Sequence, residues 1–425
     1  MLRTVAKAWK IPDIRKKILF TLAMLLIFRI GSQIPVPGMD RDVLANTFDS
    51  DAGLFALFNL FSGGAFSNFT IFALSITPYI TASIIMQLLA IAIPSLERLR
   101  KEGTEGRKKM AQYTRYLTVG LAIIQAIGVS IGLFRQALIS TDPFSVTVIV
   151  LVLAAGTAFL MWLGEMINEH GIGNGISLII FGGIIARLPS ACQEIWNKLQ
   201  DGTMSIITLI LFAIFCVLVI VGIIMIQQGQ RRIPVQYAKR MVGRKMYGGQ
   251  ATHIPLKVNQ AGVIPVIFAM SFLQFPLTVT YFMSSDSNAA LFIEKWLSPM
   301  GTPGVWVYAA INVVLIIFFT YFYTSVTFNP EDVAQNMKSS GGFIPGIRPG
   351  KATVEYLNRV MNRITFVGAI FLAAVAILPT IISQFGGLDF RFGGTSLLIA
   401  VGVGLDTMKQ LEQQMVMRNY SGFLK

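Results

Sequence analysis

The side chains best suited to catalysis or metal binding are few and scattered in this sequence. It contains two histidines, His170 and His253, and two cysteines, Cys192 and Cys216. No phosphate-binding glycine loop, zinc-ligand spacing, nucleophile elbow or paired carboxylate motif accompanies them. Only Cys216 lies in an apolar stretch, so no disulfide framework is expected. We therefore expect no enzyme, no cofactor and no bound metal.

Ionisable residues are also rare inside the apolar stretches. Arg29 lies two-thirds along the first stretch, and Glu165 and Asp406 lie near the ends of others. An ion-coupled transporter keeps such groups near the bilayer midplane, where they carry the coupling. Arg29 can instead reach the outer interface with its long side chain. The pattern favours structural anchoring for all three residues.

Two connections are richly basic, and the first of them carries no acid. Residues 227–258 hold seven Lys or Arg and no Asp or Glu, and residues 338–351 combine Lys338, Arg348 and Lys351 with many turn formers. Such loops suit acidic protein or RNA surfaces. Charge that merely orients the chain in the membrane is the better interpretation of any single lysine. For the whole acid-free connection we favour docking.

The composition predicts an all-α, polytopic membrane protein. Hydrophobic residues make up 54% of the 425 residues, charged residues make up 13%, and the mean hydropathy is +0.64. Stretches of about 20 apolar residues can each cross a bilayer as a helix. The first stretch follows a basic cluster but lacks a small-x-small cleavage pattern, so we expect it to be retained. We predict ten spans, near 18–36, 72–93, 116–134, 146–164, 175–189, 204–226, 260–283, 305–326, 364–384 and 394–411.

The distribution of positive charge predicts the orientation of these spans. Alternate connections hold 28 Lys and Arg, against 6 in the opposite set. By the positive-inside rule both termini are cytoplasmic. The connection 165–174 has no Lys or Arg although this topology places it inside.

Residues 53–69 are apolar but interrupted by Gly63 and Gly64. The segment is too short to cross alone, and non-helical backbone at membrane depth is tolerated only within protein or beside a cavity. It is therefore either re-entrant or the first part of a long, kinked second span.

Seven ordered motifs resemble the SecY family of protein translocation channel subunits, over about residues 12–412. They are Gly-Ile-Gly-Asn-Gly-Ile-Ser at 171–177, Gln-Gly-Gln-Arg-Arg-Ile at 228–233, Tyr-Ala-Lys-Arg at 237–240, Pro-Leu-Lys-Val-Asn at 255–259, Gly-Val-Ile-Pro at 262–265, Phe-Ile-Pro-Gly-Ile-Arg-Pro-Gly at 343–350 and Gly-Gly-Thr-Ser-Leu-Leu at 393–398.

The resemblance implies a clamshell of two five-helix halves in inverted pseudo-repeat, with a short re-entrant plug. The N-terminal half would cover 1–190, with the plug at about 53–69, and the C-terminal half 191–412, with cytoplasmic docking loops 227–258 and 327–363. Residues 413–425 would form a cytoplasmic tail. The halves would hinge between spans five and six and open sideways to lipid.

The resemblance also assigns candidate site residues. A pore ring would comprise Ile76, Ile80, Ile176, Ile180, Ile267 and Ile399. Plug residues would be Leu57, Phe58, Leu60, Phe61, Gly63 and Gly64, and lateral-gate residues Thr81, Gln125 and Ser271. Residues facing a ribosome or the motor ATPase SecA would be Arg231, Arg232, Lys239, Arg240, Arg244, Lys245, Arg348 and Lys351. Without the resemblance, isoleucines in a span would be lipid-facing or packing residues.

The function that follows from the resemblance is a passive, gated channel for unfolded polypeptides in the bacterial cytoplasmic membrane. It would release membrane segments sideways into lipid, bind signal sequences and unfolded preproteins, and be braced by small SecE-like and SecG-like membrane subunits. An ion-coupled secondary transporter would require a carboxylate at midplane. A membrane-bound scaffold for ribosomes would need the basic loops but no ring.

Overall fold

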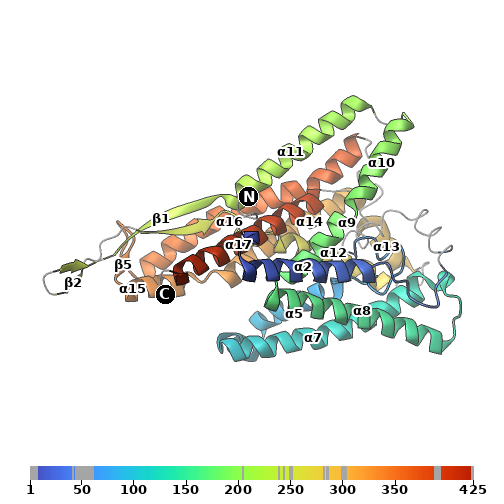
Figure 1. Ribbon diagram of the computed structural model, residues 1–425, viewed down its shortest axis with the longest axis horizontal. Helices are drawn as coiled ribbons and strands as arrows, with labels where there is room; N and C mark the ends of the chain where they lie inside the picture. The colour runs from blue at the N-terminus through green and yellow to red at the C-terminus, as the bar shows by residue number, and fades with distance from the viewer. Residues whose placement is uncertain are drawn as a thin grey trace.

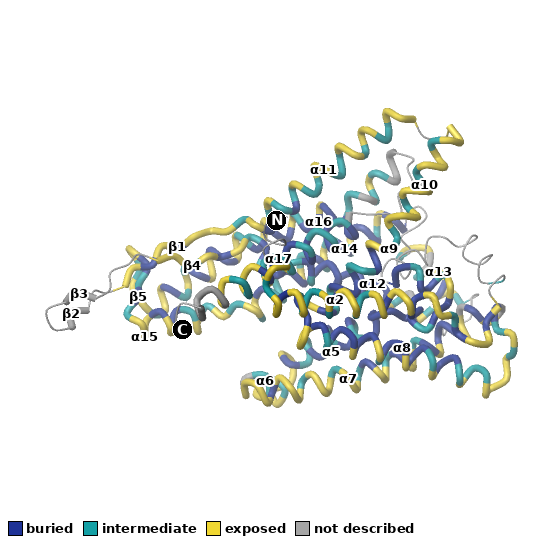
Figure 2. Tube along the Cα trace, viewed as in Figure 1, coloured by how far each residue is buried: buried dark blue, intermediate teal, exposed yellow. Residues whose placement is uncertain are grey.

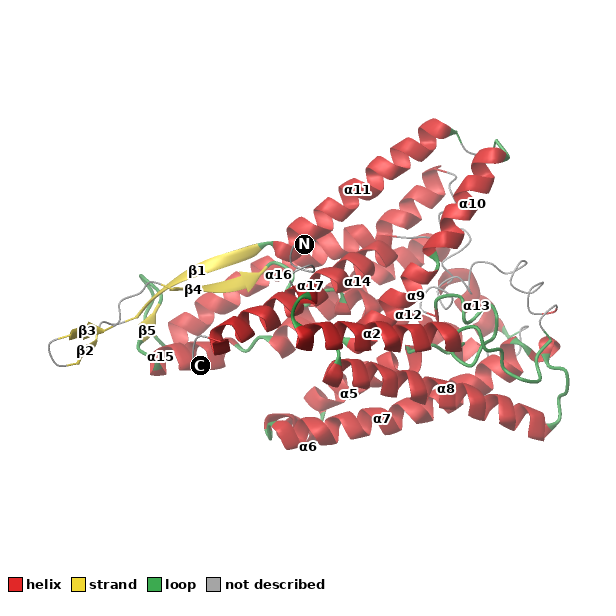
Figure 3. Ribbon diagram, in the orientation of Figure 1, coloured by secondary structure: helices red, strands yellow, loops and turns green. Residues whose placement is uncertain are grey.

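A computed structural model describes residues 8–40, 43, 62–202, 205–237, 240–242, 245–247, 252–280, 283, 287–297, 304–386 and 394–422. The chain forms a bundle of tilted helices with a β-stranded arm that projects from one end (Figures 1 and 3). The helices of this bundle that correspond to the predicted spans are α2 (Pro12–Gly31), α5 (Thr77–Ala92), α7 (Thr104–Ile127), α8 (Pro143–His170), α9 (Gly175–Ala186), α11 (Ile206–Gln228), α12 (Ile264–Thr280), α14 (Gly304–Thr327), α16 (Lys351–Gly386) and α17 (Gly394–Gly422). Shorter helices are α6 (Pro94–Lys101), α10 (Leu188–Gln200), α13 (Asn288–Leu297) and α15 (Pro330–Ser339), and a π-helical turn, η1 (Gly128–Leu133), prolongs α7.

Six helical stretches within the described part of the chain are long and apolar enough to cross a membrane. A seventh is obtained if α5 and α6, which meet at an angle of 106°, count as one broken span. The remaining helices of the bundle are shorter or carry charged turns, as at the start of α2 with Arg15, Lys16 and Lys17. The bundle is thus of the multispan class that the composition predicts.

Several helices continue beyond the predicted spans. Helix α7 begins at Thr104, α8 continues to His170, α16 begins at Lys351 and α17 continues to Gly422. Hydropathy marks the part of a helix that fits the bilayer, but charged residues such as Lys and Glu are good helix formers outside it. Residues 413–422, expected as a tail, therefore continue α17.

The connection 227–258 is an antiparallel hairpin, not a loop, so the all-α expectation is wrong there. Strand β1 (Gln230–Tyr237) pairs with β4 (Thr252–Lys257), in a register that sets Ile233 opposite Ile254. The tip carries β2 (Arg240–Val242) paired with β3 (Lys245–Tyr247). Strand β5 (Gly342–Phe343) adds to the other edge of β1, giving the order β4-β1-β5. The alternation of Ile233 with Val235, and of Ile254 with Leu256, is the period-two signal of such strands.

The arm has its own apolar core. Alternate residues of β1 point into it, and they pack there against α15 and the first turns of α16. This arm cluster comprises Ile233, Val235, Leu256, Met337, Ile344, Leu357, Val360 and Met361. The two basic connections therefore fold into one structure.

Three further apolar clusters occupy the bundle, where Figure 2 shows the buried residues, and the smallest comprises Ala8, Ile14, Ile172 and Leu411. The central cluster joins nine helices of both halves and includes Phe28, Ile84, Leu163, Ile184, Ile223, Phe319, Leu372 and Val403. The outer cluster lies at the end away from the arm and includes Val36, Met39, Phe66, Phe69, Phe134, Ile149 and Leu153. By contrast most of α11 is exposed (Figure 2), although it packs along one side against α17.

Candidate functional site

The six isoleucines named from the resemblance all belong to the central cluster. Ile76 precedes the first turn of α5 and Ile80 follows on that turn, Ile176 and Ile180 lie on α9, Ile267 on α12 and Ile399 on α17. Five are no more than 5% exposed, and Ile176 is partly buried against the others' cluster. Side chains from four helices and from both halves of the chain are thus gathered inside the bundle, away from its lipid-facing surface.

The local sequence determines where α9, the helix that carries Ile176 and Ile180, begins. Asn174 caps α9 by accepting a hydrogen bond from the Ser177 N–H at 3.1 Å, while the Asn168 side chain accepts from the Gly175 N–H at 2.8 Å. A Cβ at Gly175 would overlap the carbonyl group of Gly164 on α8. The motif at 171–177 thus lets α9 begin in close contact with α8, which sets the position of Ile176.

The segment expected as the plug is only partly described, because residues 53–61 lie outside the described residues. Residues 62–76 form consecutive turns and not the first part of a long second helix, since α5 begins only at Thr77. Gly63 and Gly64 have φ of +64° and +93°. Ala65 belongs to the central cluster, and Phe66 and Phe69 to the outer cluster. We call residues 62–76 the turn segment.

The three gate residues lie on three different helices of the bundle. Helix α5 carries Thr81, and it packs against α7, which carries Gln125, and against α12, which carries Ser271. The Thr81 hydroxyl donates to the Thr77 carbonyl oxygen at 3.1 Å, a local bond within α5. Within the described part of the chain no hydrogen bond joins any two of these three side chains. The structure therefore brings their helices together but not the polar groups themselves.

Buried polar groups that sequence reasoning missed lie on the same side of the bundle. Gln274, one turn beyond Ser271 on α12, is 2% exposed and neither atom of its amide has a hydrogen-bond partner. The Ser130 hydroxyl in η1, which contacts α12, is also buried and unpaired. The sequence signal that could have identified them is a glutamine inside an apolar stretch, because a buried polar group normally needs a hydrogen-bond partner.

Strand pairing joins the two basic connections in one sheet. Arg231 and Arg232 are exposed on β1, and Arg348 and Lys351 are exposed just after β5, which pairs with the end of β1. Arg240 and Lys245 lie in β2 and β3 of the tip, while Lys239 and Arg244 lie outside the described residues. The Thr353 hydroxyl donates to the Arg348 carbonyl oxygen at 2.9 Å, which ties the Arg348 turn to the start of α16.

The three ionisable residues of the apolar stretches have distinct surroundings. Arg29 donates from Nη1 to the Gly63 carbonyl oxygen at 3.2 Å, so its guanidinium contacts the turn segment and does not only reach outward. Glu165 accepts from Arg115 Nε at 2.8 Å, which links α8 to α7. Asp406 lies on α17 near Gly262. Both cysteines are free, and no group of three metal-ligating side chains occurs among the described residues.

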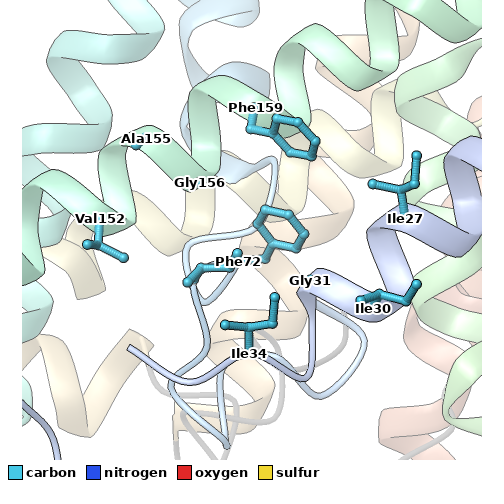
Figure 4. Close-up of a pocket in the computed structure, with 10 residues that line it drawn as sticks. Ile27, Ile30, Gly31, Ile34, Phe72, Val152, Ala155, Gly156 and Phe159 are labelled. Carbon is cyan, nitrogen blue, oxygen red and sulfur yellow. The ribbon is translucent and has the colours of Figure 1, made fainter. Parts of the chain in front are cut away.

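An apolar pocket of about 620 Å³ lies beside the turn segment, between α2 and α8 (Figure 4). Phe72 of the turn segment enters the space between these helices. Cβ atoms at Gly31 on α2 and Gly156 on α8 would overlap the Phe72 ring and the Ile71 carbonyl group, respectively. The two glycines therefore admit the turn segment between the helices.

Comparison with known proteins agrees with this architecture. The sequence profile of the SecY family matches residues 70–408. The protein translocase subunit SecY of Halalkalibacterium halodurans is 51% identical over 436 residues, which cover 100% of each chain. A solved structure described as a protein conducting channel has a TM-score of 0.67 at 22% identity and covers 95% of this chain and 93% of its own.

A second solved structure, Sec61 in the canine ribosome–channel complex from the endoplasmic reticulum, has a TM-score of 0.61 at 20% identity and covers 95% of this chain and 93% of its own. These structures share the fold of the bundle, and the apolar helical stretches make the chain a multi-pass membrane protein. Full-length identity of about one half is far beyond what a shared fold requires. The chain belongs to the SecY family of protein translocase subunits.

Proposed function

We propose that this chain is the central subunit of a protein-conducting channel, which passes unfolded secretory polypeptides across the bacterial cytoplasmic membrane. The observation that carries the proposal is the gathering of Ile76, Ile80, Ile176, Ile180, Ile267 and Ile399 in one buried cluster built by both halves of the chain. An apolar constriction offers a moving chain no fixed charge or hydrogen bond, and it opposes water and ions by dewetting. The central subunit supplies no chemistry of its own to this transport.

The closed state is held, in this proposal, by the turn segment on one side of the ring and by the gate helices on the other. Ala65 of the turn segment packs in the same cluster as the ring. Helix α5 of the N-terminal half, and the turn η1 that prolongs α7, contact α12 of the C-terminal half. An apolar signal sequence entering between them replaces the packing of these helices against one another with its own hydrophobic contacts, so the gate opens toward lipid.

The topology of the proposal has ten membrane helices in two inverted halves, with both termini and the β-stranded arm in the cytoplasm. The 28-to-6 distribution of Lys and Arg supports this orientation. The exposed Arg231, Arg232 and Arg348 of the arm form the surface for a ribosome or for SecA, either of which supplies the energy. Sec61, a structural neighbour, is described in a ribosome–channel complex. SecE-like and SecG-like subunits brace the bundle.

Site-specific crosslinking of a stalled secretory chain tests the proposal. A photoreactive residue at position 267 should crosslink strongly to the stalled polypeptide, because Ile267 is 5% exposed in the central cluster. The matched control is position 214 on α11, where Ile214 is 53% exposed on the outside of the bundle. Equal crosslinking from both positions, or crosslinking from position 214 alone, would refute a central path.

A further inference from the structure

The part of the turn segment that lies farther along the chain, residues 69–72, is attached by backbone hydrogen bonds. The Val36 N–H donates to the Phe69 carbonyl oxygen at 3.0 Å, and the Ile71 N–H donates to the Ile34 carbonyl oxygen at 3.0 Å. Phe72 fits between α2 and α8 (Figure 4). Residues 69–72 are therefore fixed to the outer end of α2 and to α8.

At its near end, residues 62–65, two of the described contacts lie at Gly63, and Ala65 packs in the central cluster. Arg29 Nη1 donates to the Gly63 carbonyl oxygen at 3.2 Å. A Cβ at Gly63 would lie 2.7 Å from Cα of Gly183 on α9, so the two backbones are in direct contact. Gly183 follows Ile180 by three residues, which is one helical turn. The contact thus places the near end of the turn segment directly beside the isoleucine ring.

The backbone of the turn segment is held in a conformation that its residues do not favour. Phe69 and Ser75 have φ of +41° and +54°, and both side chains are buried. Positive φ is unfavourable for residues other than glycine and persists only where surrounding contacts enforce it. The contacts of the segment with its surroundings therefore hold this strained backbone in place.

We propose that Arg29 and Gly63 form a releasable clamp that holds the turn segment beside the ring in the resting channel, with Arg29 as a positioning residue. The clamp rests on the proposed channel function. A guanidinium presents several hydrogen-bond donors. Because the Arg29 side chain is exposed at the outer end of α2, water can replace the Gly63 carbonyl oxygen at little cost. The bond is therefore strong enough to bias the closed state and weak enough to break during transport.

The first test removes the guanidinium. The channel, with its small membrane subunits, is reconstituted into vesicles that contain a halide-sensitive dye. Arg29→Ala should raise the resting halide leak about fivefold, the factor that one net hydrogen bond supplies, and leave the maximal rate of precursor transport unchanged. Arg29→Lys should restore part of the seal. Arg135→Ala is the matched control, because Arg135 is also an exposed cation of the outer loops but has no contact with Gly63.

A leak in Arg29→Ala equal to that of the parent protein would overturn the clamp. So would an equal increase in Arg135→Ala, since the effect would then be one of outer-surface charge. Loss of transport together with the leak would show a folding defect and count against a positioning role.

The second test separates contact from backbone strain. Gly63 and Gly64 both have positive φ, but a Cβ at Gly63 would clash with Gly183, whereas a Cβ at Gly64 would have nothing within 4 Å. Gly63→Ala should therefore leak more than Gly64→Ala. Equal leaks in the two variants would assign the effect to strain alone and overturn the clamp.

The same vesicles separate the clamp from the function on which it rests. If the parent protein transports a precursor and the variants do not leak, the clamp is wrong and the channel remains. If the parent protein transports no precursor, the proposed function itself fails.

Discussion

At the scale of single residues, the least explained feature is a buried amide without a partner. Gln274 on α12 is 2% exposed and both its polar atoms are unpaired. Burying an amide without a hydrogen bond destabilises the folded state by about 1–3 kcal/mol. We expect Gln274→Met, which keeps the volume, to raise the midpoint of thermal unfolding in detergent. A lower midpoint would show that the amide is paired in the folded protein.

The ion pair between α7 and α8 allows a second residue-scale prediction. Arg115 and Glu165 lie 2.8 Å apart and their side chains are 45% and 23% exposed, so the pair is partly screened by solvent. Glu165→Gln should cost about 0.5 kcal/mol of stability, measured as a lower unfolding midpoint at low salt that converges with the parent at high salt. Glu105→Gln is the control, since the Lys108–Glu105 pair is more than 70% exposed on both sides. Equal shifts in both variants would contradict a role for burial.

The residues of the proposed ring could be named from the sequence only through the family motifs. The i, i+4 spacing of Ile76 with Ile80 and of Ile176 with Ile180 puts each pair on one helix face, but a face of isoleucines suits lipid as well as a pore. Distance in the sequence hides the fact that α5, α9, α12 and α17 converge. For the same reason the contact of Arg29 with Gly63 had no sequence signal.

At the scale of elements, the length of the apolar stretches predicted the helices of the bundle well. It predicted the ends of these helices and the β-stranded arm poorly. Helix α10 was missed because it is amphipathic, not apolar throughout. The strands β1 and β4 were missed because their alternating apolar residues lie among so many Lys, Arg and Gly that the connection resembles a loop. Only the pairing of β1 with β5 shows that both basic connections belong to one sheet.

That shared sheet leads to an element-scale prediction. Arg348 is exposed in a turn between Pro345-Gly346 and Pro349-Gly350, and the Thr353 hydroxyl ties this turn to α16. Arg348→Glu should reduce SecA-driven transport of a precursor into vesicles while the protein still inserts and folds. Arg98→Glu makes the same change at an exposed position of α6 and should transport normally. Transport that is normal in Arg348→Glu, or equally impaired in both, would remove Arg348 from the docking surface.

At the scale of the whole molecule, the two halves of the chain meet around an uncharged centre. The central cluster draws residues from α2, α5, α8 and α9 of the first half and from α11, α12, α14, α16 and α17 of the second. The exposed apolar side chains instead cover outer helices such as α11. This separation of a buried isoleucine centre from a lipid-facing surface is what a sealed conduit between two halves requires.

The resting leak of the channel tests this central claim most directly. All six ring isoleucines are replaced by asparagine in one variant and by valine in another, and the halide leak of reconstituted vesicles is compared with that of the parent protein. We predict a large leak through the asparagine ring, because polar side chains keep the constriction wet, and a nearly sealed valine ring, because valine remains apolar. An asparagine ring that leaks no more than the parent protein, in a variant that still transports precursor, would contradict the account.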